Sequence, residues 1–262
     1  MKKKTIPLFL LCALLLAGCQ KGEVPPAFSQ LPEPTPKTAQ ELLEEQPIDD
    51  THDAFLVDTG GRLGTLLVTV ERGEQNPEGE LRGYFVTFSL WDPQKTDRPI
   101  QVMESEMEYG AFKHYDVVDA NFDGYQDFGY MWFMGNQPTY WEYWIWNEKT
   151  GQFELEPELS GISDPFFDAE KEEIRGWARE SGASEGVNTI HMWVDGEPVC
   201  MRRIEVYRKG AFDGTFVLTV QDRIDGELTE VFRMEYPEGS GGYFDERTKW
   251  GDLDYHGEAE GS

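Results

Sequence analysis

The residues best suited to chemistry in this sequence are a closely spaced set of oxygen donors near the middle of the chain. The set consists of Asp119, Asn121, Asp123, Gly124, Tyr125 and Asp127. Donors at positions 1, 3 and 5 converge when the chain curls around a cation, a glycine at position 6 permits the turn, and position 7 offers its carbonyl. Because carboxylate and amide oxygens are hard donors, the spacing predicts Ca²⁺ bound by Asp119, Asn121, Asp123, Tyr125 and Asp127.

The pattern departs from an EF-hand at its last position. An EF-hand needs a bidentate glutamate at position 12, where this sequence has Tyr130. The following residues, 128–133, favour a strand rather than a helix. We therefore expect the shorter calcium loop found between strands of β proteins, with a structural role. The alternative is an Asx-rich turn that binds nothing, because Asp, Asn and Gly are also common turn residues.

Other candidate catalytic residues lack the partners that their chemistry needs. Residues 182–186 match G-x-S-x-G around Ser184, but polar residues precede them where a nucleophile elbow needs a buried strand. The four histidines show no zinc-ligand spacing. Cys200 has no Cys/His pattern around it and is expected to be a buried small side chain. No pair of carboxylates stands out for glycoside hydrolysis. We therefore expect a protein that is not an enzyme.

The N-terminus has the three parts of a lipoprotein signal peptide. Lys2 to Lys4 form a basic region, Ile6 to Leu16 form an apolar run, and residues 16–19 match a lipobox that ends at Cys19. The apolar run is too short for a membrane span, which needs about 20 residues. We therefore predict an exported protein, lipid-anchored at the cell envelope through Cys19 alone. The alternative is an ordinary secretory signal with a coincidental cysteine.

The charge of the chain excludes some partners. It has 23 basic and 50 acidic residues, a net charge of −27. Removal of residues 1–18 takes away three lysines and no acids, which leaves 20 basic against 50 acidic residues and a net charge of −30. Such a charge opposes binding to nucleic acid. It suits a soluble surface, a cationic partner or divalent cations.

The sequence divides into four segments. They are a lipoprotein signal peptide at 1–18, the lipidated cysteine with a disordered, proline-rich linker at 19–51, a β-rich calcium-loop domain at 52–237, and an acidic, glycine-rich tail at 238–262. We expect the linker and the tail to lie outside the folded domain, because their composition buries little apolar surface.

The domain is predicted to be all-β. Short runs rich in Val, Thr, Tyr, Trp and Phe recur between Gly, Asp and Asn, at residues 63–70, 83–91, 127–133, 140–146, 188–194, 203–207, 216–220 and 230–236. Asp195-Gly196 and Asp225-Gly226 predict hairpin turns, whereas residues 168–179 fit a helix or a hairpin. We expect an antiparallel meander that forms an incomplete β-propeller-like domain, with a β-sandwich as the alternative.

One aromatic segment offers a second candidate surface. Strand alternation sends Trp141, Tyr143 and Ile145 to one face and Tyr140, Trp144 and Trp146 to the other. The simpler interpretation is a central strand that is buried on both faces. The alternative is an exposed platform for stacking on sugar rings or for anchoring a protein, formed by Tyr140, Trp141, Tyr143, Trp144 and Trp146.

Two parts of the sequence resemble known families. Residues 118–127 resemble the FG-GAP/VCBS-type calcium loop of propeller-like bacterial surface proteins. The aromatic strand at 140–147 is followed by Glu148-Lys-Thr-Gly-Gln-Phe153, Leu159 and Ser163-Asp-Pro-Phe-Phe-Asp168. That order is similar to a family of small secreted or lipid-anchored proteins that includes the immunity protein of a bacterial type IV secretion system. The family is related in fold to the periplasmic inhibitors of invertebrate-type lysozyme.

The resemblance covers roughly residues 110–210 and implies an incomplete β-propeller with a calcium loop. In characterised members it also implies a loop that plugs a lysozyme-like active site. Our leading hypothesis is a surface-anchored, calcium-stabilised β domain that binds a protein partner and inhibits a lysozyme-like cell-wall hydrolase. The alternatives are a carbohydrate or peptidoglycan-fragment binding module that uses the aromatic strand, and a hydrolase.

Overall fold

The computed structural model describes residues 36–75, 83–107, 113–135, 138–179, 185–210 and 214–257. The predicted signal peptide, Cys19, the first part of the predicted linker and Ser184 lie outside the described residues. Within the described part of the chain, no helix is long and apolar enough to span a membrane.

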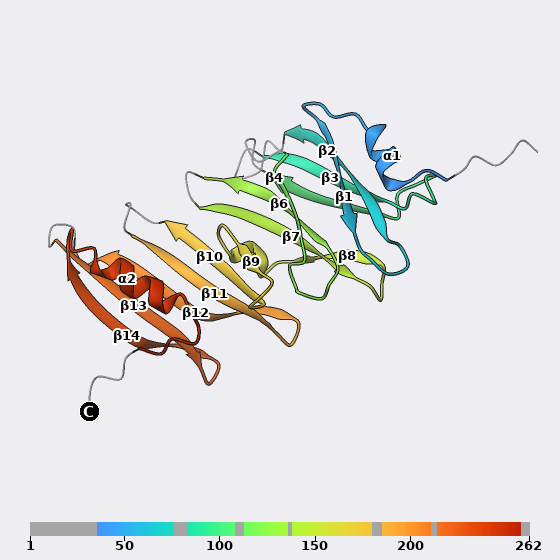
Figure 1. Cartoon of the computed structure of the whole chain (residues 1–262). Coiled ribbons are helices and arrows are strands. Elements are labelled where there is room, and N and C mark those ends of the chain that lie inside the picture. The colour runs from blue at the N-terminus through green and yellow to red at the C-terminus, as the bar shows by residue number, and fades with distance from the viewer. Residues whose placement is uncertain are drawn as a thin grey trace, which may run out of the picture. The chain divides into compact units, whose positions relative to one another are not determined.

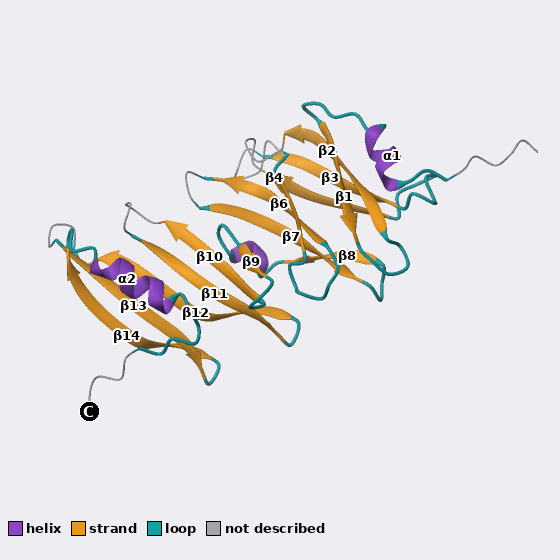
Figure 2. Ribbon diagram, viewed as in Figure 1, coloured by secondary structure: helices purple, strands orange, loops and turns teal. Residues whose placement is uncertain are grey.

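The fold consists almost entirely of antiparallel strands (Figure 2). The helices are α1 (Ala39–Glu44) and α2 (Gly242–Trp250), and the strands are β1 (His52–Asp58), β2 (Thr65–Gln75), β3 (Tyr84–Trp91), β4 (Gln101–Met107), β5 (Tyr115–Val118), β6 (Asp127–Met134), β7 (Thr139–Asn147), β8 (Gln152–Glu156), β9 (Phe166–Asp168), β10 (Glu173–Arg179), β11 (Gly186–Val194), β12 (Glu197–Arg208), β13 (Thr215–Ile224) and β14 (Glu227–Pro237).

Three meanders make up the fold (Figure 1). Strands β1 to β4 form the first sheet, β5 to β8 the second, and β9 to β14 the third, and neighbours in each sheet are consecutive in the sequence. The all-β class and the antiparallel meander are therefore confirmed, and the described strands close no barrel. The first two sheets have the four-stranded order of a propeller blade, whereas the third has six strands.

The second sheet is covered on both faces. On one face, Phe128 of β6 packs against Phe88 of β3, with their ring centroids 5.6 Å apart. On the other face, Tyr143 of β7 packs against Phe167 of β9, with ring centroids 5.0 Å apart. The ring of Tyr143 also fills the space beside Gly129, where an added Cβ would lie 2.4 Å from the ring. Strand β7 is thus an interior strand with aromatic packing on both sides.

Local sequence determines the hairpin turns. Asp195 and Gly196 have φ angles of 53° and 91°, and Asp225 and Gly226 have φ angles of 51° and 88°. Positive φ at both central residues is the conformation of a two-residue type I′ turn, which Asp-Gly adopts readily. Both predicted hairpins are confirmed by the pairing of β11 with β12 and of β13 with β14. Residues 168–179 form the β9–β10 hairpin rather than a helix.

The folded part extends beyond the predicted domain at both ends. Helix α1 lies inside the predicted linker and begins with a capping box, in which Thr38 and Glu41 bond reciprocally. Helix α2 lies inside the predicted tail, and its Tyr243 and Trp250 are buried. These two residues are seven positions apart, so they lie on one face of the helix and contact the third sheet. The expectation of a separate tail over 238–257 was therefore wrong.

Arg202 explains why the chain folds back after β14. Its side chain is 1% exposed and bonds both carboxylate oxygens of Asp222, at 2.6 and 2.8 Å. Its Nη1 donates to the carbonyl oxygens of Trp250 and Asp252, at 3.1 and 2.6 Å. The guanidinium also lies 5.0 Å from the centre of the Trp250 ring. One buried cation therefore joins β12, β13 and the end of α2.

Candidate functional site

The predicted cation loop connects β5 to β6 and draws its polar side chains together. The main-chain N–H of Asp123 donates both to Oδ1 of Asp119, at 3.0 Å, and to Oδ1 of Asn121, at 3.1 Å. The N–H of Gly124 donates to the other oxygen of Asp119, at 2.8 Å. Because one N–H reaches both side chains, the oxygens of Asp119 and Asn121 lie next to each other. Gly124 has a φ of 90°, the left-handed turn expected at position 6.

Asp127 lies at the base of this loop and is fully buried. One carboxylate oxygen accepts from the N–H of Ala120, at 2.8 Å, and the other accepts from the N–H of Trp146, at 2.7 Å. Burial is the largest cause of a raised pKa of Asp127, and it outweighs the lowering effect of the two N–H groups. Together with the smaller effect of the nearby carboxylates of Asp123 and Asp119, it brings that pKa to about 7. Asp127 thus ties the loop to β7.

The donor set fits a hard cation in part. The side-chain oxygens of Asp119 and Asn121 lie next to each other, and the Asn121 amide nitrogen donates to the carboxylate of Asp123 at 2.9 Å. Carboxylate and amide oxygens are the donors that Ca²⁺ takes. Among the described residues, no three His, Cys, Asp or Glu side chains are grouped to hold a metal, so Asp127 does not join the two loop carboxylates as a third. A cation here would be held by Asp119, Asn121, Asp123 and the carbonyl of Tyr125, with water completing its coordination.

The loop contacts a glycine-rich turn between β1 and β2. Gly60 and Gly61 have φ angles of 56° and 51°, and a Cβ on Gly60 would lie 3.1 Å from the ring of Tyr125. The N–H of Gln126 donates to the carbonyl of Asp58, and the side chain of Gln126 accepts from the N–H of Asp58. The two residues that follow Gly124 therefore contact the end of β1 and the turn after it.

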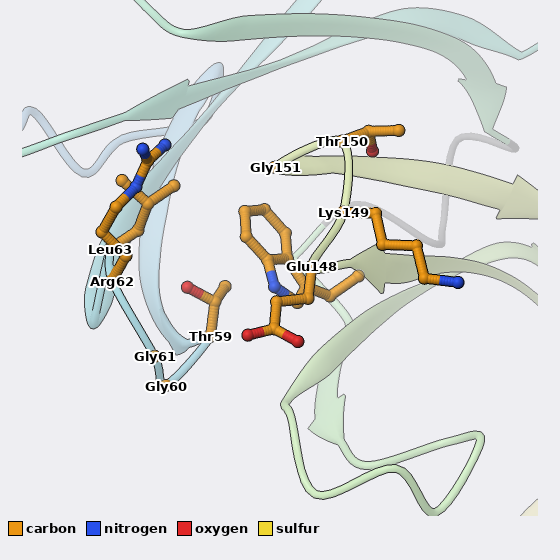
Figure 3. Close-up of a pocket in the computed structure, with 10 residues that line it drawn as sticks. Thr59, Gly60, Gly61, Arg62, Leu63, Glu148, Lys149, Thr150 and Gly151 are labelled. Carbon is orange, nitrogen blue, oxygen red and sulfur yellow. The ribbon is translucent and has the colours of Figure 1, made fainter.

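A pocket of 400 Å³ lies between this glycine turn and the β7–β8 turn, and Thr59, Leu63, Trp146 and Gly151 are among its lining residues. Figure 3 shows the side chain of Glu148 extending toward the glycine turn, whereas Lys149 points away from it. The Glu148 carboxylate accepts a hydrogen bond from the phenol of Tyr125, which raises the pKa of that phenol. Glu148 therefore links the cation loop to the β7–β8 turn.

A larger groove opens beside the cation loop. Its volume is 620 Å³, and it is bounded by the loop, by β7 and β8 with their turn, and by the β11–β12 hairpin. The lining residues are Asn121, Asp123, Tyr125, Ile145, Trp146, Asn147, Glu148, Lys149, Glu154, Leu155, Glu156, Trp193 and Gly196. The loop residues that sequence spacing singles out thus form one wall of a concave surface.

The five aromatic residues of the predicted platform do not share one exposed face. Tyr143 and Trp146 are buried, at 0% and 4% exposure, whereas Tyr140, Trp141 and Trp144 are half-buried. The half-buried ring of Tyr140 forms a cluster with Trp132 and Phe133. Its ring centroid lies 5.9 Å from that of Trp132 and 6.0 Å from that of Phe133.

Several interior polar contacts could not be found from the sequence. The carboxylate of Glu142 accepts from Ser105 of β4, at 2.9 Å, and from the phenol of Tyr130. The indole N–H of Trp193 donates to the carbonyl of Ala120 inside the cation loop, at 2.8 Å. Both contacts join different sheets, so neither has a signal in local spacing.

Cys200 is half-buried, and its Sγ lies 3.5 Å from the carbonyl oxygen of Arg202. Burial raises the pKa of its thiol, which favours the unreactive protonated form.

The fold and the loop together define an all-β protein built from antiparallel meanders, with a candidate cation loop between two strands. No protein family model matches the sequence, and no curated protein matches it. Among solved structures, the chain is similar to a Xanthomonas type IV secretion system related protein, with a TM-score of 0.47 and 14% identity over 72% of this chain and 95% of that chain.

Proposed function

We propose that this protein is a calcium-stabilised β domain without catalytic activity, lipid-anchored at the cell envelope, which binds a basic protein partner. The observation that carries the proposal is the excess of acidic residues, 50 against 23 basic residues. Many described basic side chains are already paired within the fold, such as Arg202 with Asp222 and Lys209 with Glu235. A large part of the negative charge is therefore not neutralised within the fold and can attract a cationic partner.

A negative field of this size favours association with a cationic protein. Such a field accelerates encounter and selects against acidic partners, while apolar contacts slow dissociation. We further propose that the partner is a lysozyme-like cell-wall hydrolase and that binding inhibits it. The resemblance of residues 110–210 to a family that contains lysozyme inhibitors supports this finer proposal, as does the fit between an acidic domain and a cationic hydrolase.

The binding test is a calorimetric titration of the mature chain, with Cys19 replaced by serine, against purified cationic lysozymes of several types at about 0.15 M salt. We expect a saturable complex with at least one of them and none with an acidic protein of similar size. Absence of binding to every hydrolase, or binding that disappears when salt rises from low to physiological strength, would contradict the proposal.

The lipid anchor is a separate part of the proposal. It is supported by the lipobox that ends at Cys19. In a bacterial host the wild-type chain should sediment with the membrane fraction, and Cys19→Ser should release it into the soluble exported fraction. If the two chains distribute equally between the membrane and soluble fractions, the proposed lipid anchor at Cys19 is contradicted.

The alternative, a carbohydrate-binding module, is favoured by one observation, the half-buried cluster of Trp132, Phe133 and Tyr140. Aromatic rings at a surface stack on sugar rings. Binding of soluble peptidoglycan fragments, lost in Tyr140→Ala, would support this alternative over the protein-binding proposal.

A further inference from the structure

We propose that the 620 Å³ groove beside the cation loop binds a basic side chain, lysine or arginine, from the partner protein. The inference rests on the proposed protein-binding function and adds the site and the chemistry of the recognised group. The observations that support it are the shape of the groove, its charges and its apolar wall.

The groove is shaped by three parts of the chain that are distant in sequence. The cation loop contributes Asn121 and Asp123, strand β8 contributes residues 154–156, and the β11–β12 hairpin contributes Trp193 and Gly196. Trp193 is held in place because its indole N–H donates to Ala120 of the loop. The ring therefore presents its carbon surface, and not its polar atom, to the groove.

The charges along the groove are strongly unequal. Four carboxylates line it, from Asp123, Glu148, Glu154 and Glu156, against the single cation of Lys149. Burial raises the pKa of Glu156, and the nearby carboxylates of Glu158 and Glu197 raise it further, as expected where negative charge is crowded. A cationic group entering the groove would relieve this repulsion.

The apolar part of the groove suits the stem of a long basic side chain. Leu155 is 41% exposed, and it lies with Ile145 and Trp193 along the same groove. Lysine and arginine have three or four methylenes that pack on apolar surface while the charged end stays among polar groups. An indole ring also attracts a cation placed over its face. A simple divalent cation would use the carboxylates and leave this apolar wall unused.

The probe for this proposal is acetyl-lysine-methylamide, with acetyl-norleucine-methylamide as the control that keeps the stem and removes the charge. Each is titrated into the mature Cys19→Ser chain, labelled with ¹⁵N, while the indole N–H signals of Trp193 and Trp146 are followed by NMR. We expect saturable shifts of both signals with the lysine probe and binding weaker by about five-fold or more with the norleucine probe. The titration is run in calcium and in chelator, because Asp123 belongs to both the loop and the groove.

Two double variants distinguish binding in the groove from attraction by the overall negative charge of the protein. Glu154→Gln with Glu156→Gln should weaken the lysine probe by about five-fold or more. The matched control is Glu104→Gln with Glu227→Gln, two exposed acids on β4 and β14 that do not line the groove. This control removes the same charge and should leave binding unchanged. Equal loss in the two double variants, or equal binding of the two probes, would overturn the proposal.

The outcome also distinguishes the groove from the proposed function. A hydrolase that binds both double variants with wild-type affinity would leave protein binding in place and overturn the groove as its site. Binding of the lysine probe without binding of any hydrolase would support the groove and contradict the named partner.

Discussion

The carboxylate of Asp127 and the main-chain N–H of Trp146 are joined by a hydrogen bond of 2.7 Å, across 19 residues of sequence. The second oxygen of Asp127 accepts from Ala120 within the loop. Asparagine would keep one acceptor and turn an NH₂ group toward a buried N–H. We therefore expect Asp127→Asn to lower the free energy of unfolding by about 2 kcal/mol.

The measurement for Asp127 is urea unfolding in the presence of chelator. Asp123→Asn is the control, because the carboxylate of Asp123 accepts hydrogen bonds from Asn121 and Tyr125, which both belong to the loop. In chelator this control should change stability by less than about 0.5 kcal/mol. Equal destabilisation by the two variants would contradict the separate role of Asp127.

Calcium should stabilise the folded chain. A cation bound only by the folded loop stabilises the fold by about 2.7 kcal/mol at a 100-fold excess over the dissociation constant. Calcium should therefore raise the thermal midpoint of the wild-type chain, and Asp123→Ala should abolish the increase. Asp97→Ala, an exposed acid outside the loop, should keep it. Equal wild-type midpoints in millimolar calcium and in chelator would exclude a calcium site.

Features specified by a few adjacent residues could be predicted from the sequence. The Asp-Gly pairs determine both hairpin turns, and the alternation of residues 140–146 gives the two faces of β7. The closeness of the Asp119 and Asn121 side-chain oxygens follows from their spacing. These features need no partner from elsewhere in the chain.

Features that depend on distant partners could not be predicted. Asp127 occupies position 9 of the loop and is therefore predicted to be a cation ligand. In the structure its carboxylate accepts a hydrogen bond from the main chain of β7. Helix α2 lies in a glycine-rich acidic segment, and its burial depends on Arg202, about 50 residues earlier. The lining of the groove joins three hairpins or loops. In each case the feature depends on a tertiary contact between residues distant in sequence. Composition and local spacing do not predict such contacts.

Arg202 provides a prediction about stability. Truncation to methionine leaves Asp222 without its partner and frees the carbonyls of Trp250 and Asp252. Breaking a buried pair typically costs about 3–5 kcal/mol, so Arg202→Met should lower the unfolding free energy by that order. Arg203→Met removes a partly exposed pair with Glu205 and should cost less than about 1 kcal/mol. Similar values in urea unfolding for the two variants would contradict the role given to Arg202.

His191 provides a prediction about pH. Burial lowers its pKa to about 4 in the folded state from 6.5, and the positive charge of Arg223 adds to the effect. The unfolded chain therefore takes up the proton first, and stability present above pH 6.5 is lost as the pH falls toward 4. Between about pH 7 and pH 5 this group should remove about 2 kcal/mol of stability.

The measurement for His191 is the free energy of unfolding at both pH values in three chains. His191→Gln should show a smaller loss than the wild type by about 2 kcal/mol. His256→Gln, at an exposed position, should match the wild type. Identical pH profiles for wild type and His191→Gln would contradict this account.

The central claim, that the domain binds and inhibits a basic cell-wall hydrolase, is tested most directly by the loss of turbidity of a cell-wall suspension. Lysozymes of several types are assayed with and without the mature Cys19→Ser chain, at about 0.15 M salt and in calcium. We predict that micromolar protein slows at least one lysozyme and that Glu154→Gln with Glu156→Gln weakens the effect. Unchanged rates for every lysozyme, or slowing that vanishes when salt screens the charges, would contradict specific inhibition.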